Sequence, residues 1–218
     1  MLANANKYNA DAVLCDMVRE SKIGSVNMIN VLEEGAYDKK ASLEKIYPIM
    51  LFNYEVDGPA TNPSLCNKMI RRSILEKIIF SVDGTIAYGK DALCSYPALL
   101  DSHIISVIRK PFYHYRDNEA SVTNVYDNTL LDKFLLLHDE LKRQFEKRGL
   151  DATEQLYGYV ARYSLECVRK ELILNKKLPL KKRAEVVKGY IKDARVSLAL
   201  KQAIEKTCNK KENDITLQ

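Results

Sequence analysis

One carboxylate in this sequence stands where chemistry is possible. Asp91 follows the turn signal Gly89 and falls in the first turn of a helix predicted over Asp91 to Leu100. The dipole of that helix favours the ionised acid, and an ionised carboxylate can take a proton from a hydroxyl group. Aspartate is also a common cap at the start of a helix. Taken alone, the pattern favours the capping role.

Four other polar side chains are candidates for contacts with an acceptor or a phosphate. Asn67 and Lys68 precede a predicted helix, where they either line a cleft or simply form a turn. His114 and Arg116 lie on an extended edge segment predicted after the turn at Pro111. His114 could contact a phosphate, although an aromatic-rich edge strand is the simpler interpretation. Arg116 could hold a phosphate with two parallel hydrogen bonds or form a surface salt bridge.

The sequence offers no standard metal motif. No two aspartates are separated by a single residue, so an Asp-x-Asp pattern is absent. The five cysteines are odd in number and widely spaced, and no Cys-x-x-Cys pair occurs (Cys15, Cys66, Cys94, Cys167 and Cys208). We expect reduced thiols in a reducing cytosol, with neither a zinc site nor a thioredoxin-like centre. No metal is expected for this chain alone.

Composition predicts a globular protein that is soluble or at most peripheral to a membrane. Of the 218 residues 46% are hydrophobic and 29% are charged, with a net charge of +5. No apolar run approaches the ~20 residues that cross a bilayer. The basic residues are spread among acidic ones, which disfavours nucleic acid as a partner. The densest basic cluster is Lys176 and Lys177 with Lys181 to Arg183. It is either a solvated loop or a contact with anionic lipid at the inner face of the membrane.

The pattern of short apolar runs in the first half of the chain predicts a mixed α/β fold. A short helix over Leu2 to Tyr8 is expected to lead into a buried strand over Asp11 to Cys15. Further strands are predicted over Thr85 to Tyr88 and over His103 to Ile108, since both runs carry β-branched or aromatic residues.

The second half is predicted to be helical. Apolar residues recur at a spacing of three to four within residues 130–145, 156–167 and 187–198. Gly149 is expected to end the first of these helices. Asp151 and Glu154 are expected to cap the second as a pair. From Thr207 onward the chain is polar, and a frayed tail is predicted over 207–218.

Four short motifs, in order, are similar to those of family-2 glycosyltransferases that build capsular and other surface polysaccharides. Ala10 to Asp16 resembles the family's buried "aDvvvcd" strand. Asn67 to Arg72 resembles its "NKlfrr" segment, and Tyr88 to Leu93 stands in place of its "yGEDalf". Tyr113 to Arg116, followed by Ser-Val-Thr, resembles its "YyYr…SvT" ending. Together the motifs cover roughly residues 1–123.

This resemblance implies an α/β fold with a truncated GT-A-like mixed sheet, followed by a helical extension. Residues 1–123 would form the acceptor side of the domain, 124–206 the extension and 207–218 a polar tail. Members of the family begin with a nucleotide-binding half whose Asp-x-Asp carboxylates hold Mg²⁺ or Mn²⁺ on the donor diphosphate. Neither that half nor the motif is found here, so we expect a fragment that is inactive alone.

The resemblance also implies roles for single residues. Asp91 matches the family's catalytic base, which deprotonates the acceptor hydroxyl during an inverting displacement from a nucleotide sugar. Lys90 stands where the family usually has Glu, and its charge could lower the basicity of Asp91 or contact an anionic acceptor. The implied partners are a nucleotide sugar, a glycan acceptor, and either a separate N-terminal half or a second copy. The alternative is a non-catalytic interaction module or an inactive remnant.

Overall fold

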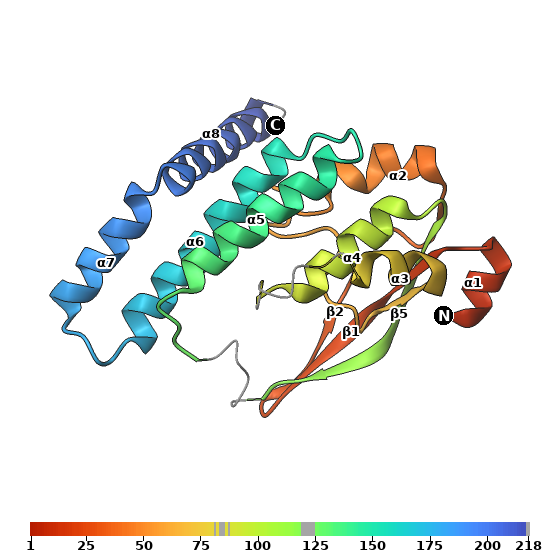
Figure 1. The fold of residues 1–218 in the computed structure, drawn as a ribbon, viewed down its shortest axis with the longest axis horizontal. Helices are drawn as coiled ribbons and strands as arrows, with labels where there is room; N and C mark the ends of the chain where they lie inside the picture. The colour runs from red at the N-terminus through yellow and green to blue at the C-terminus, as the bar shows by residue number, and fades with distance from the viewer. Residues whose placement is uncertain (81, 83–85, 87, 119–124, 217–218) are drawn as a thin grey trace.

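The computed structural model describes residues 1–80, 82, 86, 88–118 and 125–216, and side chains as far as residue 208. A five-stranded mixed sheet is followed by a set of long helices (Figure 1). The fold is therefore mixed α/β with C-terminal helices, as the sequence predicts.

Two long parallel strands form the centre of the sheet. They are β1 (Ala12–Ser21) and β5 (Ile105–Arg116). Strands β2 (Gly24–Met28) and β4 (Lys68–Ile70) pair antiparallel with different stretches of β1. Strand β3 (Gly35–Tyr37) pairs antiparallel with the beginning of β5, which gives the order β2-β1-β5-β3 with β4 beside the start of β1.

The central strands confirm two predictions and correct one. The strand expected from Asp11 begins at Ala12 and continues to Ser21. The strand expected to end at Ile108 continues through Pro111, where a turn was expected, to Arg116. Proline has no N–H to give to a ladder, and here it sits where the β1–β5 register is interrupted. The part of β5 that follows is extended and pairs with β1 alone, which confirms the edge segment.

Short helices cover the sheet. Helix α1 (Leu2–Tyr8) leads into β1 as predicted. Helix α2 (Lys39–Lys45) and a single 3₁₀ turn (Tyr47–Ile49) follow β3. Helix α3 (Arg72–Ile79) follows β4, and α4 (Lys90–Asp101) confirms the helix expected after Gly89.

The strand predicted over Thr85 to Tyr88 is wrong where the structure describes it. Thr85 and Ala87 lie outside the described residues, while Ile86 and Tyr88 belong to no strand. Ile86 is buried in the core, and the Tyr88 ring meets the Phe134 ring edge-on at 4.9 Å between centroids. The Tyr88 ring therefore packs against helix α5.

Four helices form the second half of the chain. Helices α5 (Leu130–Glu146) and α6 (Thr153–Leu174) confirm the first two apolar stripes. The third stripe spans two helices, α7 (Leu180–Lys192) and α8 (Ala194–Thr216). They separate at Asp193, whose extended backbone ends α7. The Oδ1 of Asp193 accepts from the backbone N–H groups of Arg195 and Val196 in the first turn of α8. A capping aspartate overrides the continuous periodicity.

The ends of these helices depart from three further predictions. Gly149 lies beyond the end of α5, in the turn, with φ 68°. The N-cap of α6 is Ala152; Asp151 stands one residue earlier and accepts from the Thr153 N–H at 2.8 Å. Glu154 pairs with Lys206 at 2.6 Å and not with the start of its own helix. The segment predicted to fray after residue 207 is helical as far as Thr216.

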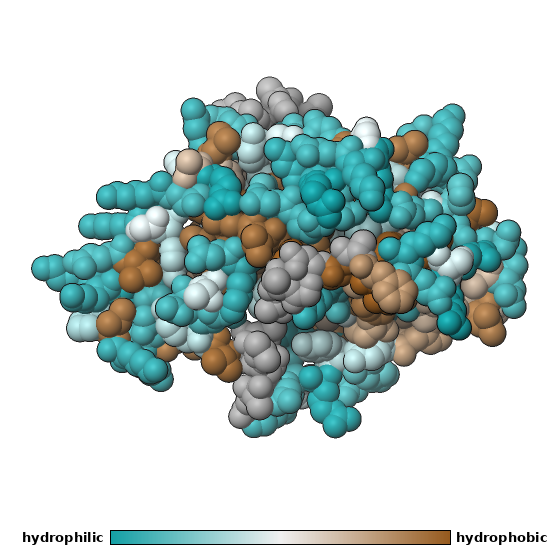
Figure 2. All heavy atoms as spheres, viewed as in Figure 1, coloured by the Kyte–Doolittle hydropathy of each residue, from teal (hydrophilic) through white to brown (hydrophobic). Residues whose placement is uncertain are grey.

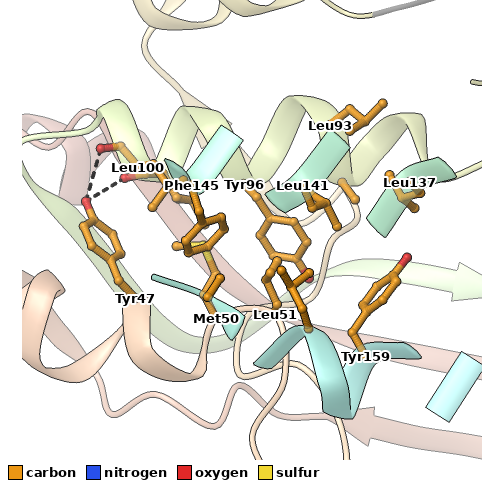
Figure 3. Packing of buried hydrophobic residues seen from close by; sticks show 14 of the residues in the cluster. Tyr47, Met50, Leu51, Leu93, Tyr96, Leu100, Leu137, Leu141, Phe145 and Tyr159 are labelled. Atoms are coloured by element: carbon orange, nitrogen blue, oxygen red, sulfur yellow. Dashed lines mark hydrogen bonds between the residues drawn. The ribbon is translucent and has the colours of Figure 1, made fainter. Parts of the chain in front are cut away.

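One continuous hydrophobic core joins the sheet to the helices. It contains side chains from β1, β5, α4, α5, α6 and α8. Figure 3 shows Tyr96 of α4 among Leu141 and Phe145 of α5, with Met50 and Leu51 beside them. The position of α4 is therefore set by contacts on several sides. No helix in the described part of the chain is both long enough and apolar enough to cross a membrane.

Candidate active site

Asp91 lies in the first turn of α4, as predicted, and its side chain is exposed. The N-cap position of this helix belongs to Gly89, and the Asp91 carboxylate bonds to a neighbouring segment instead. Its Oδ2 accepts from the backbone N–H of Leu65 at 3.2 Å and from the hydroxyl of Ser64 at 3.4 Å. Interpreting Asp91 as a simple cap of its own helix is therefore wrong.

Gly89 fixes where the helix of Asp91 begins. Its φ of 79° is left-handed, a region that side chains other than glycine rarely adopt. A Cβ atom added at Gly89 would lie 2.2 Å from a terminal carbon of Leu137 on α5. Only glycine meets both conditions, so this residue lets the start of α4 approach α5 closely.

Lys68 holds the segment of residues 62–67, which bonds to Asp91. The Lys68 ammonium donates to the backbone oxygen of Asn62, to that of Ser64 at 2.6 Å and to the Oδ1 of Asn67 at 3.0 Å. Burial lowers the pKa of this amine to about 7, against the opposing attraction of Cys66 and Asp91. The three hydrogens of the ammonium group thus have three protein acceptors.

Asn67 anchors the same segment to the sheet. Its side-chain amide donates to the backbone oxygen of Cys15 at 3.1 Å, and its backbone oxygen accepts from the Cys15 N–H at 3.0 Å. Asn67 is buried, with 2% of its surface exposed. Asn67 and Lys68 therefore support the segment that bonds to Asp91, and a role for either in binding an acceptor stays a prediction.

Lys90 precedes Asp91 in α4, while His114 and Arg116 lie on β5. Lys90 is the first residue of α4 and is exposed. His114 and Arg116 are exposed on the last residues of β5, where His114 Nδ1 lies 2.7 Å from Glu20 Oε1. Among the described contacts, none joins either residue to Asp91. Their predicted phosphate contacts are untested.

Two motif aspartates turn out to support the fold. Asp11 accepts from Arg71 Nε and from the His103 N–H, both at 2.7 Å, and so connects β1, β4 and the start of β5. Buried Asp16 accepts from the backbone and side-chain nitrogens of Asn30, at 2.7 and 2.9 Å. The first two motifs are therefore linked in space through Asp11 and Arg71.

No family model matches the chain. A search of known proteins finds a relative in Bacillus subtilis (strain 168) that bears the name "Putative glycosyltransferase EpsH". The two sequences are 25% identical over 131 residues, which are 59% of this chain and 36% of the relative. The chain thus spans little more than a third of that protein. It is similar, at a distance, to a glycosyltransferase.

Sequence reasoning missed the segment that orients Asp91. Ser64 and Leu65 supply the two donors, and Ser64 Oγ also lies 2.9 Å from Cys66 Sγ. The cluster Asn62-Pro63-Ser64 is a turn signal. Nothing in it, however, indicates that the turn meets a helix start 26 residues later in the chain.

Proposed function

We propose that this chain is the acceptor-side part of a family-2 glycosyltransferase of the GT-A type. The complete enzyme transfers a sugar from a nucleotide-sugar donor to a surface glycan, with inversion at the anomeric carbon. The observation that carries the proposal is the oriented, exposed carboxylate of Asp91 at the start of α4. The distant similarity to a glycosyltransferase supports it.

The Asp91 carboxylate suits the role of base because its two oxygens differ. Oδ2 is held by Leu65 and Ser64, whereas no bond to Oδ1 occurs within the described part of the chain. An acceptor hydroxyl that donates to Oδ1 loses its proton to Asp91 as its oxygen attacks the sugar C1. The bond from C1 to the nucleoside diphosphate breaks, and its electron pair leaves with the diphosphate.

Donor binding is assigned to a part of the enzyme outside this chain. In the family, Mg²⁺ or Mn²⁺ rests on the donor diphosphate and offsets its charge. Within the described residues, no group of three or more His, Cys, Asp or Glu side chains lies together in a way that could hold a metal ion. The sequence has no Asp-x-Asp motif either. The residues that the structure describes therefore offer no ligand set for the cation.

The surface of the sheet supports the idea that more protein covers it. Strand β2 is exposed along its whole length. The exposed fractions are 99% for Ile23 and 66% for Val26, and 53% for Phe112 and 40% for Tyr115. Large exposed apolar side chains on β2, on β5 and in the turn between β1 and β2 are typical of a contact surface. A donor-binding polypeptide is the occupant that fits the proposed function.

The test uses radiolabelled nucleotide sugars, Mg²⁺ or Mn²⁺, and the chain alone or with its donor-binding polypeptide. We expect transfer to a glycan acceptor only in the complex. Asp91→Asn should lower that transfer at least about 10²-fold while the complex still forms. Robust transfer by the chain alone would contradict the division of roles. Full activity of the Asp91→Asn complex would favour a non-catalytic interaction module.

A further inference from the structure

The turn between α6 and α7 presents apolar and basic side chains together. From Leu172 to Ala184 the chain contains five basic residues and no acidic one. Leu180 and Ile173 are 64% and 54% exposed, and Leu172 and Leu178 are 37% and 36% exposed. The turn lies at the end of the helical half that is remote from α1 and α2 (Figure 1). At this end Figure 2 shows hydrophilic side chains projecting outward, with hydrophobic ones between them.

The lysines of this turn are not neutralised by the protein. Lys176, Lys177, Lys181 and Lys182 are all exposed. No salt bridge among the described residues involves any of the four, whereas many exposed basic residues elsewhere are paired, such as Arg162 with Asp57 at 2.5 Å. Their positive charge is therefore available to a partner.

A buried polar network fixes the turn from beneath. Asn175 is 4% exposed, and its amide donates to Glu171 Oε1 at 2.7 Å and to the Tyr126 hydroxyl at 3.1 Å. The Tyr126 hydroxyl donates to Glu171 Oε2 at 2.6 Å. Arg183 closes the turn from α7 by donating to the backbone oxygen of Leu172 at 2.5 Å. These bonds tie the backbone of the turn to α6 and to the Tyr126 segment, while its leucines and lysines stay on the outer face.

We propose that this outer face, formed by residues 172–182, docks the protein on the surface of an anionic lipid bilayer. Exposed leucines and an isoleucine enter the boundary between headgroups and acyl chains, and the flanking lysines meet the phosphates of anionic lipids. A flat bilayer accepts such a projecting turn without a matching pocket. Nucleic acid would use the lysines but leave four large apolar side chains in water. The proposal does not depend on the transfer reaction.

The test is flotation of the full chain with vesicles of phosphatidylcholine, or of an equimolar mixture with phosphatidylglycerol. We expect binding to the anionic vesicles alone, weakening as salt rises. Changing Lys176, Lys177, Lys181 and Lys182 together to glutamine should lower the partition coefficient at least tenfold, since each lysine near the surface contributes about fivefold. The paired variant Ile173→Gln and Leu180→Gln should also lower it at least tenfold, at unchanged net charge.

Matched controls separate this face from general attraction of a basic protein. Lys40→Gln with Lys45→Gln removes two exposed cations from α2, and Ile23→Gln removes an apolar side chain that is 99% exposed between β1 and β2. Both should bind as the unchanged chain does. Absence of vesicle binding, or equal losses in the controls, would overturn the proposal. Tighter binding of duplex DNA through the same four lysines, indifferent to Ile173 and Leu180, would replace it with a nucleic-acid surface.

Discussion

Asp91 and Lys68 bind the same short segment from two sides. The Asp91 carboxylate accepts from Ser64 and Leu65, while the Lys68 ammonium donates to the backbone oxygen of Ser64 at 2.6 Å. Lys68 therefore fixes the backbone at Ser64, and this backbone in turn orients the exposed carboxylate of Asp91. Substitution of Asp91 should therefore change transfer, and substitution of Lys68 should change the pH dependence of stability.

Asp91→Asn should lower sugar transfer by the complete enzyme about 10²- to 10⁴-fold, because an amide cannot take the acceptor proton. The free energy of unfolding should change by less than about 0.5 kcal/mol, as the side chain is exposed and the amide oxygen can still accept from Leu65. Initial rates and urea unfolding of the same preparation measure both quantities.

The matched control is Asp132→Asn, which removes another exposed acid from the first turn of a helix, α5. It should leave transfer unchanged. Equal losses of activity in the two variants would mean that charge alone, and not the position of Asp91, matters.

Gly89→Ala should destabilise the protein by about 1–3 kcal/mol, because the new methyl group combines a positive φ with a clash against Leu137. Gly149→Ala shares the positive φ but meets no atom within 4 Å. Its loss should be smaller, about 1 kcal/mol. Thermal or urea unfolding of the two variants provides the comparison.

The double variant Gly89→Ala with Leu137→Ala tests the clash directly. Its loss should be smaller than the sum of the two single losses by at least about 0.5 kcal/mol. Additive losses would show that the approach of α4 to α5 is not what requires glycine.

Lys68 should make stability rise with pH. Burial lowers the pKa of its amine from 10.5 to about 7 in the folded protein. Between these values the unfolded chain binds more protons than the folded one, so this residue's contribution to the free energy of unfolding increases as pH rises. Urea unfolding measures the free energy of unfolding of the unchanged protein and of Lys68→Met. From about pH 7 upward, the value for the unchanged protein should rise relative to that of the variant.

Lys40→Met removes an exposed cation and serves as the matched control for Lys68→Met. A Lys68→Met difference that is constant with pH would contradict the buried, weakly basic amine. The comparison also cancels other groups that titrate in the same range, since every variant retains them.

Asp11→Ala should cost about 1–3 kcal/mol, because it leaves the part-buried N–H of His103 and the Arg71 guanidinium without their acceptor. Burial raises the pKa of this carboxyl, but the bonds from His103, Arg71 and Ile104 outweigh that effect and lower it below 3.8. The stabilisation is therefore present above about pH 4 and fades as acid protonates the folded protein.

The measurement for Asp11 is urea unfolding at neutral and acidic pH. Glu76→Ala breaks an exposed pair with Arg72 within helix α3 and should cost less than about 0.5 kcal/mol at either pH. Similar losses for the two variants would place the Asp11–Arg71 pair among ordinary surface ion pairs.

The sequence by itself determined the local elements. Apolar periodicity identifies α5 and α6, the buried run after Asp11 identifies β1, and Gly89 announces the start of α4, because backbone sterics and one-sided burial act over a few residues. The resemblance of four ordered motifs pointed to a glycosyltransferase and to Asp91.

Only the tertiary structure decided which distant residues meet. The pairing of Asp11 with Arg71 and of Asp91 with Leu65 joins residues separated by 60 and 26 positions, and no local pattern records such contacts. The same holds for Pro111, which stays in strand β5 because the neighbouring ladder is irregular there. At these positions the pairing of distant segments decides the contacts, and local strand or turn propensity does not encode it.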